Sequence, residues 1–319
     1  MSEFKMLVGL PACGKSTYSA KLEKEGYSVF SSDSIRQELG FGPGEGSGKV
    51  FELMQNRTRK ALSEGKNVIY DATNLSRKNR ASILESIKNY DCNKECVLFT
   101  EPIEECIRRD DMREGFAHVG KDVIKRMSES FTVPMAWEGF DKITRIQTVA
   151  GDPVQVYLQL ARFMEQDNHH HDLPLLAHMK QAAEIIADTY DESDKRIMEI
   201  AALYHDIGKL NTKKFIDSKG NPSKEAHYYG HENVGAYMFL SADTSSLKIT
   251  ENEKMTIASL INWHMRPYLK MNPEKRQKEY DNLGEKFTKM ILCLHEADDN
   301  AHMRKIQDVY KRNVRKVKY

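Results

Sequence analysis

The sequence predicts an α/β domain, with a parallel sheet and covering helices, over residues 1–150, followed by an all-α domain over residues 151–319. Three observations support this. The chain has 319 residues, more than one hydrophobic core usually organises. Short apolar runs alternate with amphipathic stretches in the first half, whereas helical periodicity dominates the second. The change falls at a turn-like segment, TVAGDP, at residues 148–153.

The alternation in the first half predicts strands and helices in turn. Strands are expected at 4–9, 27–31, 67–71 and 95–99, and helices at 16–25, 50–64 and 77–90. This order is typical of parallel strands joined by helices that cross over the sheet. The glycine-rich segment GFGPGEGSG, at residues 40–48, is expected to form a mobile loop.

The second half predicts helices at 175–190, 194–205, 253–264 and 285–303. We find no internal repeat. The basic run at residues 311–318 is expected to be a solvated helix end, and an arm that contacts RNA is the less favoured alternative.

Composition limits the class of protein. A net charge of +1, with 40% hydrophobic and 30% charged residues, fits a soluble globular chain without a global basic field. The first residues, MSEFKMLVGL, lack the features of a signal peptide, and no apolar run is long enough to span a bilayer. The five cysteines are odd in number and scattered, and Cys92 and Cys96 lack a second pair for zinc. We therefore expect reduced thiols and a cytoplasmic location, with no membrane partner.

A phosphate-binding loop opens the first domain. The segment GLPACGKS, Gly9 to Ser16, matches G-x-x-x-x-G-K-[ST] between a predicted strand and a predicted helix. Backbone N–H groups of such a loop surround phosphate oxygens, and the helix N-terminus adds a favourable dipole. Lys15 is expected to reach the β- and γ-phosphates, and Ser16 to bind Mg²⁺. The sequence thus predicts ATP or another nucleoside triphosphate, with Mg²⁺, at these residues: Gly9, Cys13, Gly14, Lys15, Ser16 and Thr17.

Two carboxylates follow predicted strands. Asp33 lies in SSDSIR, where a carboxylate can take the proton of an attacking hydroxyl, as a general base must. It could equally be the N-cap of the next helix. Asp71 ends an apolar strand, so it could support Mg²⁺ or Lys15.

Polar residues further along the first domain have open roles. Asn74 could cap a helix, and Arg77 and Arg80 could be surface residues. Arg109 and Arg113 are four residues apart and are expected to share a helix face. They could neutralise a triphosphate from a lid, or they could pair with the two aspartates between them on a solvent face.

The order of these motifs resembles a known family. Over residues 4–147, the chain is similar to the phage-type 5′-hydroxyl polynucleotide kinases. The similarity lies in the order of the motifs: the P-loop, S-D-x-x-R, D-A-T-N, and then R-x-x-x-R before a helix ending in F-x-x-P. The resemblance implies that Asp33 is the general base and that Arg36 contacts the acceptor-side phosphate. It implies that Arg109 and Arg113 are lid arginines. Adenylate kinase-like and other small-molecule kinases share parts of the pattern, so the acceptor stays open.

The second domain contains a histidine–aspartate pair, His205-Asp206, followed by Lys209 at the end of an apolar stretch. Imidazole and carboxylate together suit divalent metals. Further candidates come from separate predicted helices: His178, His231, His264 and Asp298. Each histidine alone is more often a packing residue, whereas the ordered set favours a metal site.

This series resembles the HD-domain metal phosphohydrolases over residues 170–303. The resemblance implies a metal (Mn, Ni, Co, Fe or Zn) held by four residues and a second held by two more histidines. These are His178, His205, Asp206 and Asp298, and then His231 and His264. Such a metal lowers the pKa of water or clamps a phosphate. Lys209 is a candidate to hold a substrate phosphate, and Asp299 could replace Asp298.

The remaining histidines are expected to have no role in the metal site. His118, His227, His295 and His302 are expected at the surface or in packing. The run His169–His171 is expected to form a polar loop, with the alternative that one member lines the phosphoesterase pocket.

Together, the halves resemble bacterial enzymes that heal RNA ends, although the kinase-first order differs from the arrangement associated with them. This implies phosphorylation of 5′-hydroxyl RNA or DNA ends, hydrolysis of 2′,3′-cyclic phosphate ends, and an RNA ligase acting downstream. One alternative is a nucleoside or small-molecule kinase fused to an HD nucleotide phosphohydrolase. Another is a nucleotide-sensing regulatory protein.

Overall fold

The computed structural model describes residues 1–168 and 173–301. The chain divides into two compact units, Met1–Gly151 and a second that begins at Asp152. The histidine run at 169–171 and the basic run at 311–318 lie outside the described residues, as does His302. Each unit is described below by itself.

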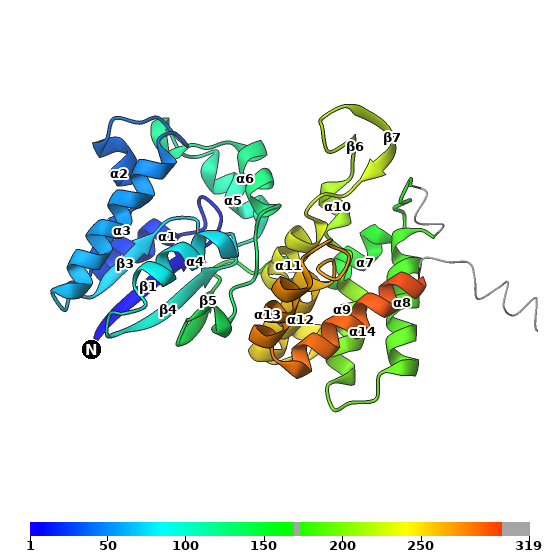
Figure 1. Cartoon of the computed structure of the whole chain (residues 1–319). Coiled ribbons are helices and arrows are strands. Elements are labelled where there is room, and N and C mark those ends of the chain that lie inside the picture. The colour runs from blue at the N-terminus through cyan, green and yellow to red at the C-terminus, as the bar shows by residue number, and fades with distance from the viewer. Residues whose placement is uncertain (169–172, 302–319) are drawn as a thin grey trace, which may run out of the picture. The chain divides into compact units, whose positions relative to one another are not determined.

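The first unit is built on a parallel sheet with the strand order β2-β3-β1-β4-β5 (Figure 1). Its strands are β1 (Ser2–Val8), β2 (Ser28–Ser31), β3 (Val68–Asp71), β4 (Cys92–Phe99) and β5 (Lys142–Ile146). This confirms the predicted α/β class and adds β5, which the sequence did not indicate. The last residues of the central strands β1 and β4 are apolar and buried, as expected of strands covered on both faces.

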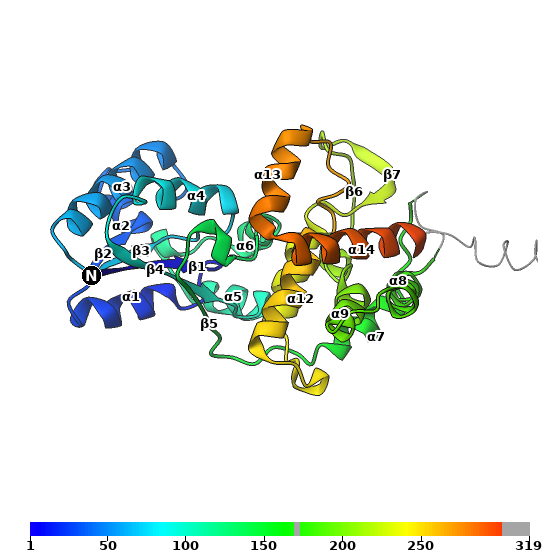
Figure 2. The same cartoon turned by 60° about the horizontal axis from the view of Figure 1, so that its bottom comes forward.

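Helices cover both faces of this sheet. They are α1 (Lys15–Lys24), α2 (Ser32–Glu38), α3 (Ser47–Ser63), α4 (Arg77–Ser86), α5 (Ile103–Asp110) and α6 (Lys121–Ser128), with short 3-10 turns at Gly115–Ala117 and Ala136–Glu138. Figure 2 shows α3 and α4 on one face and α1 and α5 on the other. Because β1 and β3 are parallel neighbours, the loops after them meet at one edge, where Gly9 N donates to Thr73 O at 3.0 Å.

The helix caps differ from those expected. Ser31 caps α2 and Ser76 caps α4, each accepting a bond from the N–H three residues further on. Asp33 instead lies in the first turn of α2. Asn74 has a left-handed backbone with φ 45°, and its amide donates to Leu7 O at 2.8 Å. The capping interpretations of Asp33 and Asn74 were therefore wrong, because each helix is capped by a serine in extended conformation next to its first turn.

Arg80 was expected at the surface but is fully buried. Its Nε and Nη2 donate to the two carboxylate oxygens of Glu138, each at 2.8 Å. The guanidinium also donates to backbone carbonyls, including those of Leu75 and Thr132. This paired and hydrogen-bonded cation ties the segment after β3 to the end of the unit, because the carboxylate lies 58 residues away along the chain.

We expect Arg80→Ala to lower the free energy of unfolding of the first unit by about 3–5 kcal/mol, because it leaves the Glu138 carboxylate buried without its partner. Urea denaturation measures the change. The matched control is Arg57→Ala, which removes an exposed ion pair with Glu38 and should cost less than about 1 kcal/mol. Equal losses from the two substitutions would contradict the assigned role of Arg80.

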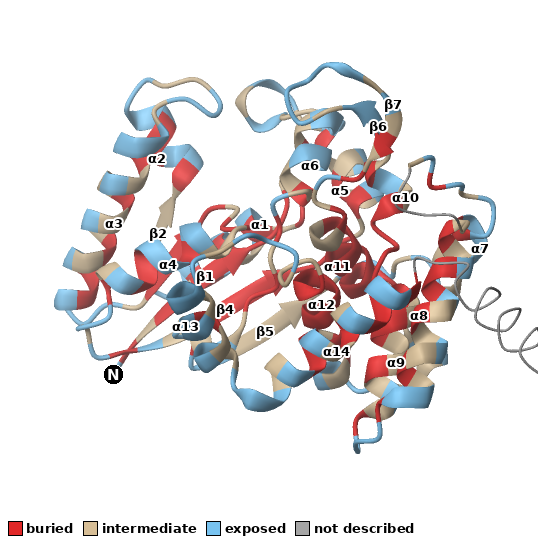
Figure 3. Ribbon diagram, turned by 45° about the vertical axis from the view of Figure 1, so that its right-hand side comes forward, coloured by how far each residue is buried: buried red, intermediate tan, exposed pale blue. Residues whose placement is uncertain are grey.

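The second unit is mostly helical, which confirms the predicted all-α class. Its helices are α7 (Gln155–Ala161), α8 (Leu175–Thr189), α9 (Lys195–Tyr204), α10 (Lys209–Thr212), α11 (His231–Ser241), α12 (Glu251–Trp263), α13 (Pro273–Leu283) and α14 (Glu285–Ala301), with a 3-10 turn at Ser245–Leu247. The sequence did not indicate the antiparallel hairpin of β6 (Lys214–Ile216) and β7 (Pro222–His227). Helices α8, α9, α11, α12 and α14 enclose the buried core (Figure 3).

Among the described residues, we find no helix with the length and apolar content required to cross a bilayer.

Candidate active sites

The phosphate-binding loop connects β1 directly to α1, as the sequence predicted. Gly14 is the residue before α1 and has φ 99°, a left-handed conformation that glycine adopts without strain. Gly9 is required for a different reason, because a Cβ there would lie 2.7 Å from Cys13 Sγ and 2.9 Å from Phe99 Cβ. The two glycines thus let the loop turn tightly against β4.

The cation of this loop is Lys15. Its Nζ donates to the carbonyl oxygens of Gly9 at 3.0 Å and Leu10 at 2.6 Å, so it lies over the loop. Cys13 Sγ is 3.4 Å from the same atom. Burial raises the pKa of the Cys13 thiol, although Lys15 opposes the shift, so the group stays a neutral thiol. Ser16 and Thr17, by contrast, are exposed.

Asp71, at the end of β3, lies beside the loop. Its Oδ2 accepts a bond from Ser19 Oγ at 2.6 Å. Burial raises the pKa of Asp71, and Lys15 partly offsets this by favouring the charged carboxylate. The carboxylate is therefore oriented by α1 and electrostatically coupled to the loop cation.

A cavity of about 380 Å³ opens at this edge of the sheet. It is lined by the phosphate-binding loop, the start of α2, the glycine-rich segment and the segment after α5. The predicted residues among its lining are Lys15, Ser16, Asp33, Arg36 and Arg113, together with Gly14 and Asp71. Three cations, a hydroxyl and two carboxylates thus line one cavity.

Within the cavity, Asp33 presents a carboxylate whose side chain is 73% exposed. Arg36 holds it through an Nη1–Oδ1 bond of 2.9 Å. Arg36 Nε in turn donates to Glu45 O in the glycine-rich segment at 3.0 Å, so Arg36 joins α2 to that segment. The carboxylate is accessible yet restricted in orientation, which is what a general base requires.

The two arginines near α5 do not share a helix face, contrary to the prediction. Helix α5 ends at Asp110, whose buried carboxylate accepts the N–H groups of Val119 and Gly120. Arg113 lies beyond the helix and lines the cavity. Arg109 Nε instead donates to Glu105 at 2.6 Å, and its guanidinium lies outside the cavity lining that the described residues form.

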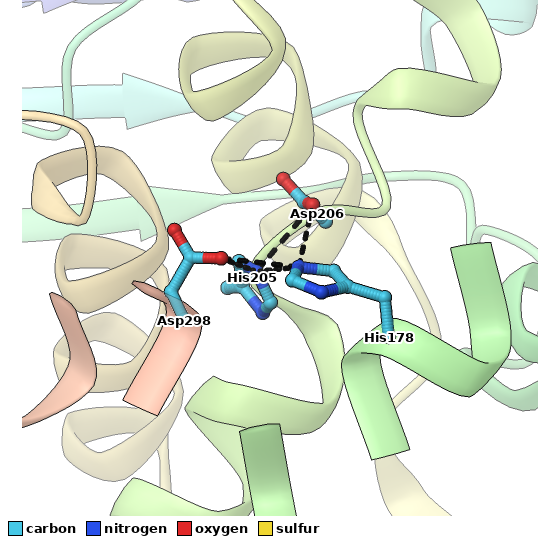
Figure 4. A group of neighbouring side chains, drawn as sticks. All are labelled: His178, His205, Asp206 and Asp298. Carbon is cyan, nitrogen blue, oxygen red and sulfur yellow. Dashed lines mark hydrogen bonds and ion pairs between the residues drawn. The ribbon is translucent and has the colours of Figure 1, made fainter. Parts of the chain in front are cut away.

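Four predicted ligands of the second unit gather in one place (Figure 4). His178 comes from α8, His205 and Asp206 follow α9, and Asp298 comes from α14. Each contributes one donor atom, and these atoms lie within 4.8 Å of one another. The Nε2 atoms of His178 and His205 are 3.2 Å apart, and Asp298 Oδ1 is 3.0 Å from His178 Nε2. All four side chains are buried.

Asp206 also belongs to a second group, with His231 and His264. Its Oδ2 lies 3.3 Å from His178 Nε2, whereas its Oδ1 lies 3.1 Å from His231 Nε2 and 3.7 Å from His264 Nε2. The Nε2 atoms of His231 and His264 are 3.2 Å apart. One carboxylate is therefore shared between two groups of donors.

The donor set fits metal ions, and the evidence is the orientation of the imidazoles. In His205, His231 and His264, Nδ1 lies 2.7, 2.8 and 2.7 Å from the carbonyl oxygen three residues earlier. A carbonyl only accepts, so Nδ1 carries a proton, and whenever a ring is neutral its Nε2 lone pair points at the cluster. Two Nε2 lone pairs about 3 Å apart repel each other. A cation between the two nitrogen atoms would be attracted by both lone pairs, so the same arrangement becomes favourable when a metal ion is bound.

Charges in the cluster favour a bound cation. Burial opposes ionisation of Asp206 and Asp298, yet the neighbouring cations outweigh it and hold the pKa of both carboxyls well below the usual range. Burial likewise works against a charged His205, but the two carboxylates raise its pKa to about 10. Burial and the other imidazoles lower the pKa of His264 to about 3. A metal ion would therefore have to displace a proton from His205, whereas His264 is neutral and can bind the ion without losing a proton.

Gly208 allows the two groups to approach. A Cβ there would lie 1.9 Å from His231 O and 2.6 Å from Gly235 N, both backbone atoms of α11. The turn that carries Asp206 thus packs directly against the start of α11. Only glycine permits this contact.

The structure adds two residues that the sequence did not single out, Tyr268 and Gln166, and it shows the contacts of Lys209. Tyr268 donates its hydroxyl to Asp298 Oδ2 at 3.2 Å, and burial raises the pKa of Tyr268, so the hydroxyl keeps its proton. Lys209 is buried, with Nζ 2.7 Å from Asp206 Oδ2 and 2.8 Å from Gln166 Oε1. No local sequence pattern indicates Tyr268 or Gln166, because Tyr268 contacts Asp298, and Gln166 contacts Lys209, across a long stretch of chain.

The other histidines and Asp299 have other surroundings. Asp299 is exposed, whereas Asp298 is buried in the cluster. His295 packs edge-on against Tyr268 at 4.1 Å between ring centroids. His118 Nδ1 lies 3.0 Å from Asp110 O, and the ring of His227 is stacked with that of Tyr229.

Comparisons with known proteins define the two domains. A family model described as an AAA domain matches residues 5–134, and a model described as an HD domain matches residues 175–299. The chain therefore carries a P-loop kinase domain of the AAA type followed by an HD domain.

Solved structures resemble parts of the chain. A chain of a Pnkp1/Rnl/Hen1 complex is 24% identical, with a TM-score of 0.32, over 34% of this chain and 38% of that chain. A chain of the Pnkp1/Rnl/Hen1 RNA repair complex is 21% identical, with a TM-score of 0.36, over 40% and 42%. This chain thus covers about two fifths of the length of either. A gluconokinase from Sinorhizobium meliloti 1021 is 14% identical, with a TM-score of 0.33, over 46% and 82%. No curated protein matches.

Proposed function

We propose that this chain heals nucleic-acid ends with two activities. The first transfers the γ-phosphate of ATP to a 5′-hydroxyl of RNA or DNA, and the second hydrolyses a 2′,3′-cyclic phosphate or a 2′- or 3′-phosphate. The observation that carries the proposal is the pairing, in one chain, of a P-loop cavity containing Asp33 with a shared-carboxylate His/Asp cluster. One site suits adding a phosphate and the other suits removing one, which are the two changes that a broken strand needs before ligation.

In the kinase cavity, Asp33 accepts the proton of the 5′-hydroxyl as its oxygen forms a bond to the γ-phosphorus. The bond from the γ-phosphorus to the bridging oxygen breaks, and ADP leaves. Lys15 and Arg113 offset the charge that spreads over the transferring group, and Ser16 would be the ligand of the loop for a bound Mg²⁺. Arg36 keeps the Asp33 carboxylate oriented toward the acceptor.

In the HD domain, His178, His205, Asp206 and Asp298 would hold one divalent ion, and Asp206, His231 and His264 a second. Mixed imidazole and carboxylate donors suit Mn, Fe, Co, Ni or Zn. Ions bound there would lower the pKa of water and offset phosphate charge. Tyr268 orients Asp298, Lys209 orients Asp206, and backbone carbonyls fix the imidazoles.

The direct test gives the whole chain ATP, divalent metal and an RNA that carries a 5′-hydroxyl and a 2′,3′-cyclic phosphate. We expect a 5′-phosphate and a phosphate-free 3′-end. Competition with nucleosides and small polyols separates a polynucleotide kinase from a small-molecule kinase. ATP bound without turnover would support a regulatory protein instead, and unchanged RNA ends would rule out end healing.

The two arginines near α5 are expected to differ in effect. Arg113→Ala should lower kcat for 5′-phosphorylation by about 100-fold, because it removes a cation that lines the cavity. Arg109→Ala should change kcat by less than about threefold, since its guanidinium lies against Glu105. Steady-state kinetics on a 5′-hydroxyl oligonucleotide measures both, and a larger loss from Arg109→Ala would contradict this assignment.

Partner and location follow from the proposed chemistry. A ligase that consumes 5′-phosphate and 3′-hydroxyl ends is the natural next step, so we propose an RNA ligase downstream. The free cysteines, Cys13, Cys92, Cys96, Cys106 and Cys293, support action in the reducing cytoplasm.

A further inference from the structure

The β6–β7 hairpin carries exposed lysine and aromatic side chains. We define the hairpin surface as Lys214, Lys219, Lys224 and Tyr229. Phe215 and Tyr229 are 47% and 43% exposed, and every residue of β6 is exposed. The hairpin projects from the helices of the second unit (Figure 1). Large rings exposed on a projecting two-stranded sheet contribute little to a core.

Both ends of the hairpin are attached to the metal-ligand cluster. Before β6, Lys209 binds Asp206 at 2.7 Å. After β7, Tyr228 is buried, and its carbonyl oxygen accepts the Nδ1–H of His231 at 2.8 Å. Tyr229 lies two residues before the ligand His231. A chain that lies along the hairpin surface is therefore led toward the cluster.

The hairpin surface has the flat rings and cations that single-stranded nucleic acid binds. The rings of His227 and Tyr229 are stacked, with centroids 5.4 Å apart and planes 6° apart. Lys214 pairs with His227 across the hairpin, so their side chains share a face, whereas Phe215, the next residue of β6, faces the opposite side.

Charge on the hairpin is complementary to a phosphodiester backbone. Residues 213–229 contain four lysines against two carboxylates, Asp217 and Glu225. The segment is therefore positive, although the whole chain has a net charge of only +1.

We propose that the hairpin surface binds the single-stranded nucleotides adjacent to the end that the HD cluster processes. A base stacks on the exposed ring of Tyr229, which lies on the same face as Lys214, and Lys214, Lys219 and Lys224 contact the phosphates. This inference rests on the proposed function and assigns its HD site a polymeric substrate rather than a free nucleotide.

The first test measures binding of a fluorescent single-stranded RNA of about ten nucleotides, without terminal phosphates, to the whole chain by anisotropy. Tyr229→Ala should weaken binding about tenfold. The double variant Lys219→Ala/Lys224→Ala should reduce the slope of log K against log salt by about 1.4. The matched controls are Leu292→Ala and Lys275→Ala/Lys278→Ala, which change equally exposed residues on α13 and α14 and should leave binding unchanged.

The second test compares hydrolysis of a 2′,3′-cyclic phosphate on an oligonucleotide and on a mononucleotide. Both hairpin variants should raise KM for the oligonucleotide about tenfold, leave kcat unchanged and leave mononucleotide hydrolysis within about twofold. Equal effects on the two substrates would overturn the proposal. Normal RNA binding by both variants would also overturn it. So would variants whose only change is in self-association, as measured by sedimentation. If the wild type hydrolyses neither substrate, the proposed function fails, while the anisotropy experiment still decides the hairpin surface.

Discussion

Asp206→Ala is expected to abolish phosphoester hydrolysis, by at least about 1,000-fold, and to leave 5′-phosphorylation intact. The reason is that the two oxygens of Asp206 face different donor groups, so one substitution removes a ligand from both. It also leaves Lys209 buried without its carboxylate partner. Metal content, measured by mass spectrometry of the purified chain, should fall from about two ions to less than about one.

His231→Ala is the comparison that isolates the shared carboxylate. It removes a donor from the second group alone, so about one ion should remain. Thermal unfolding and kinase assays on both variants show whether each chain is folded. Equal metal loss from the two substitutions would contradict the shared role of Asp206, and a parallel loss of kinase activity would contradict independent sites.

Asp33→Ala is expected to lower kcat for 5′-phosphorylation by about 100- to 10,000-fold, because it removes the carboxylate that takes the proton of the acceptor. ATP affinity should change by less than about threefold, since the Asp33 side chain is largely exposed and is bonded to Arg36 rather than to the phosphate-binding loop. Kinetics with a 5′-hydroxyl oligonucleotide gives kcat, and fluorescence of a labelled ATP analogue gives affinity.

The matched control for Asp33 is Glu38→Gln, which removes an exposed carboxylate from the same helix. It should leave kcat unchanged. If Asp33→Ala weakened ATP binding strongly and preserved kcat at saturation, the carboxylate would serve nucleotide binding and the assignment as general base would be wrong.

The fold class was predictable because its signals are local. Alternation of apolar runs with helical periods indicated the parallel sheet, and GLPACGKS between a strand and a helix indicated the loop that β1 and α1 form. The hairpin was missed, although Asp217, Gly220 and Asn221-Pro222 are turn-forming residues that could have indicated it.

Details of the sites depend on contacts between distant segments. Helix α5 ends at Asp110, whose carboxylate accepts the backbone N–H groups nine and ten residues later. The sequence Asp110-Asp111 alone does not predict these bonds or the helix end. Likewise, the Asp206 carboxylate faces two donor groups only because the chain bends after α9. Arginine is usually exposed, so the burial of Arg80 depends on Glu138, which no local pattern reveals.

Gly208 also fixes the distance between the two groups of candidate metal ligands in the second unit. Because Gly208 touches the main chain of His231 and Gly235, the spacing between the paired donor groups is set by contact of two polypeptide backbones. Rotating an imidazole cannot alter that spacing. If the two groups held transition metals, exchange for a metal of different radius would have to be absorbed within each donor group separately, and a bulkier residue at position 208 would separate the two groups without changing any ligand.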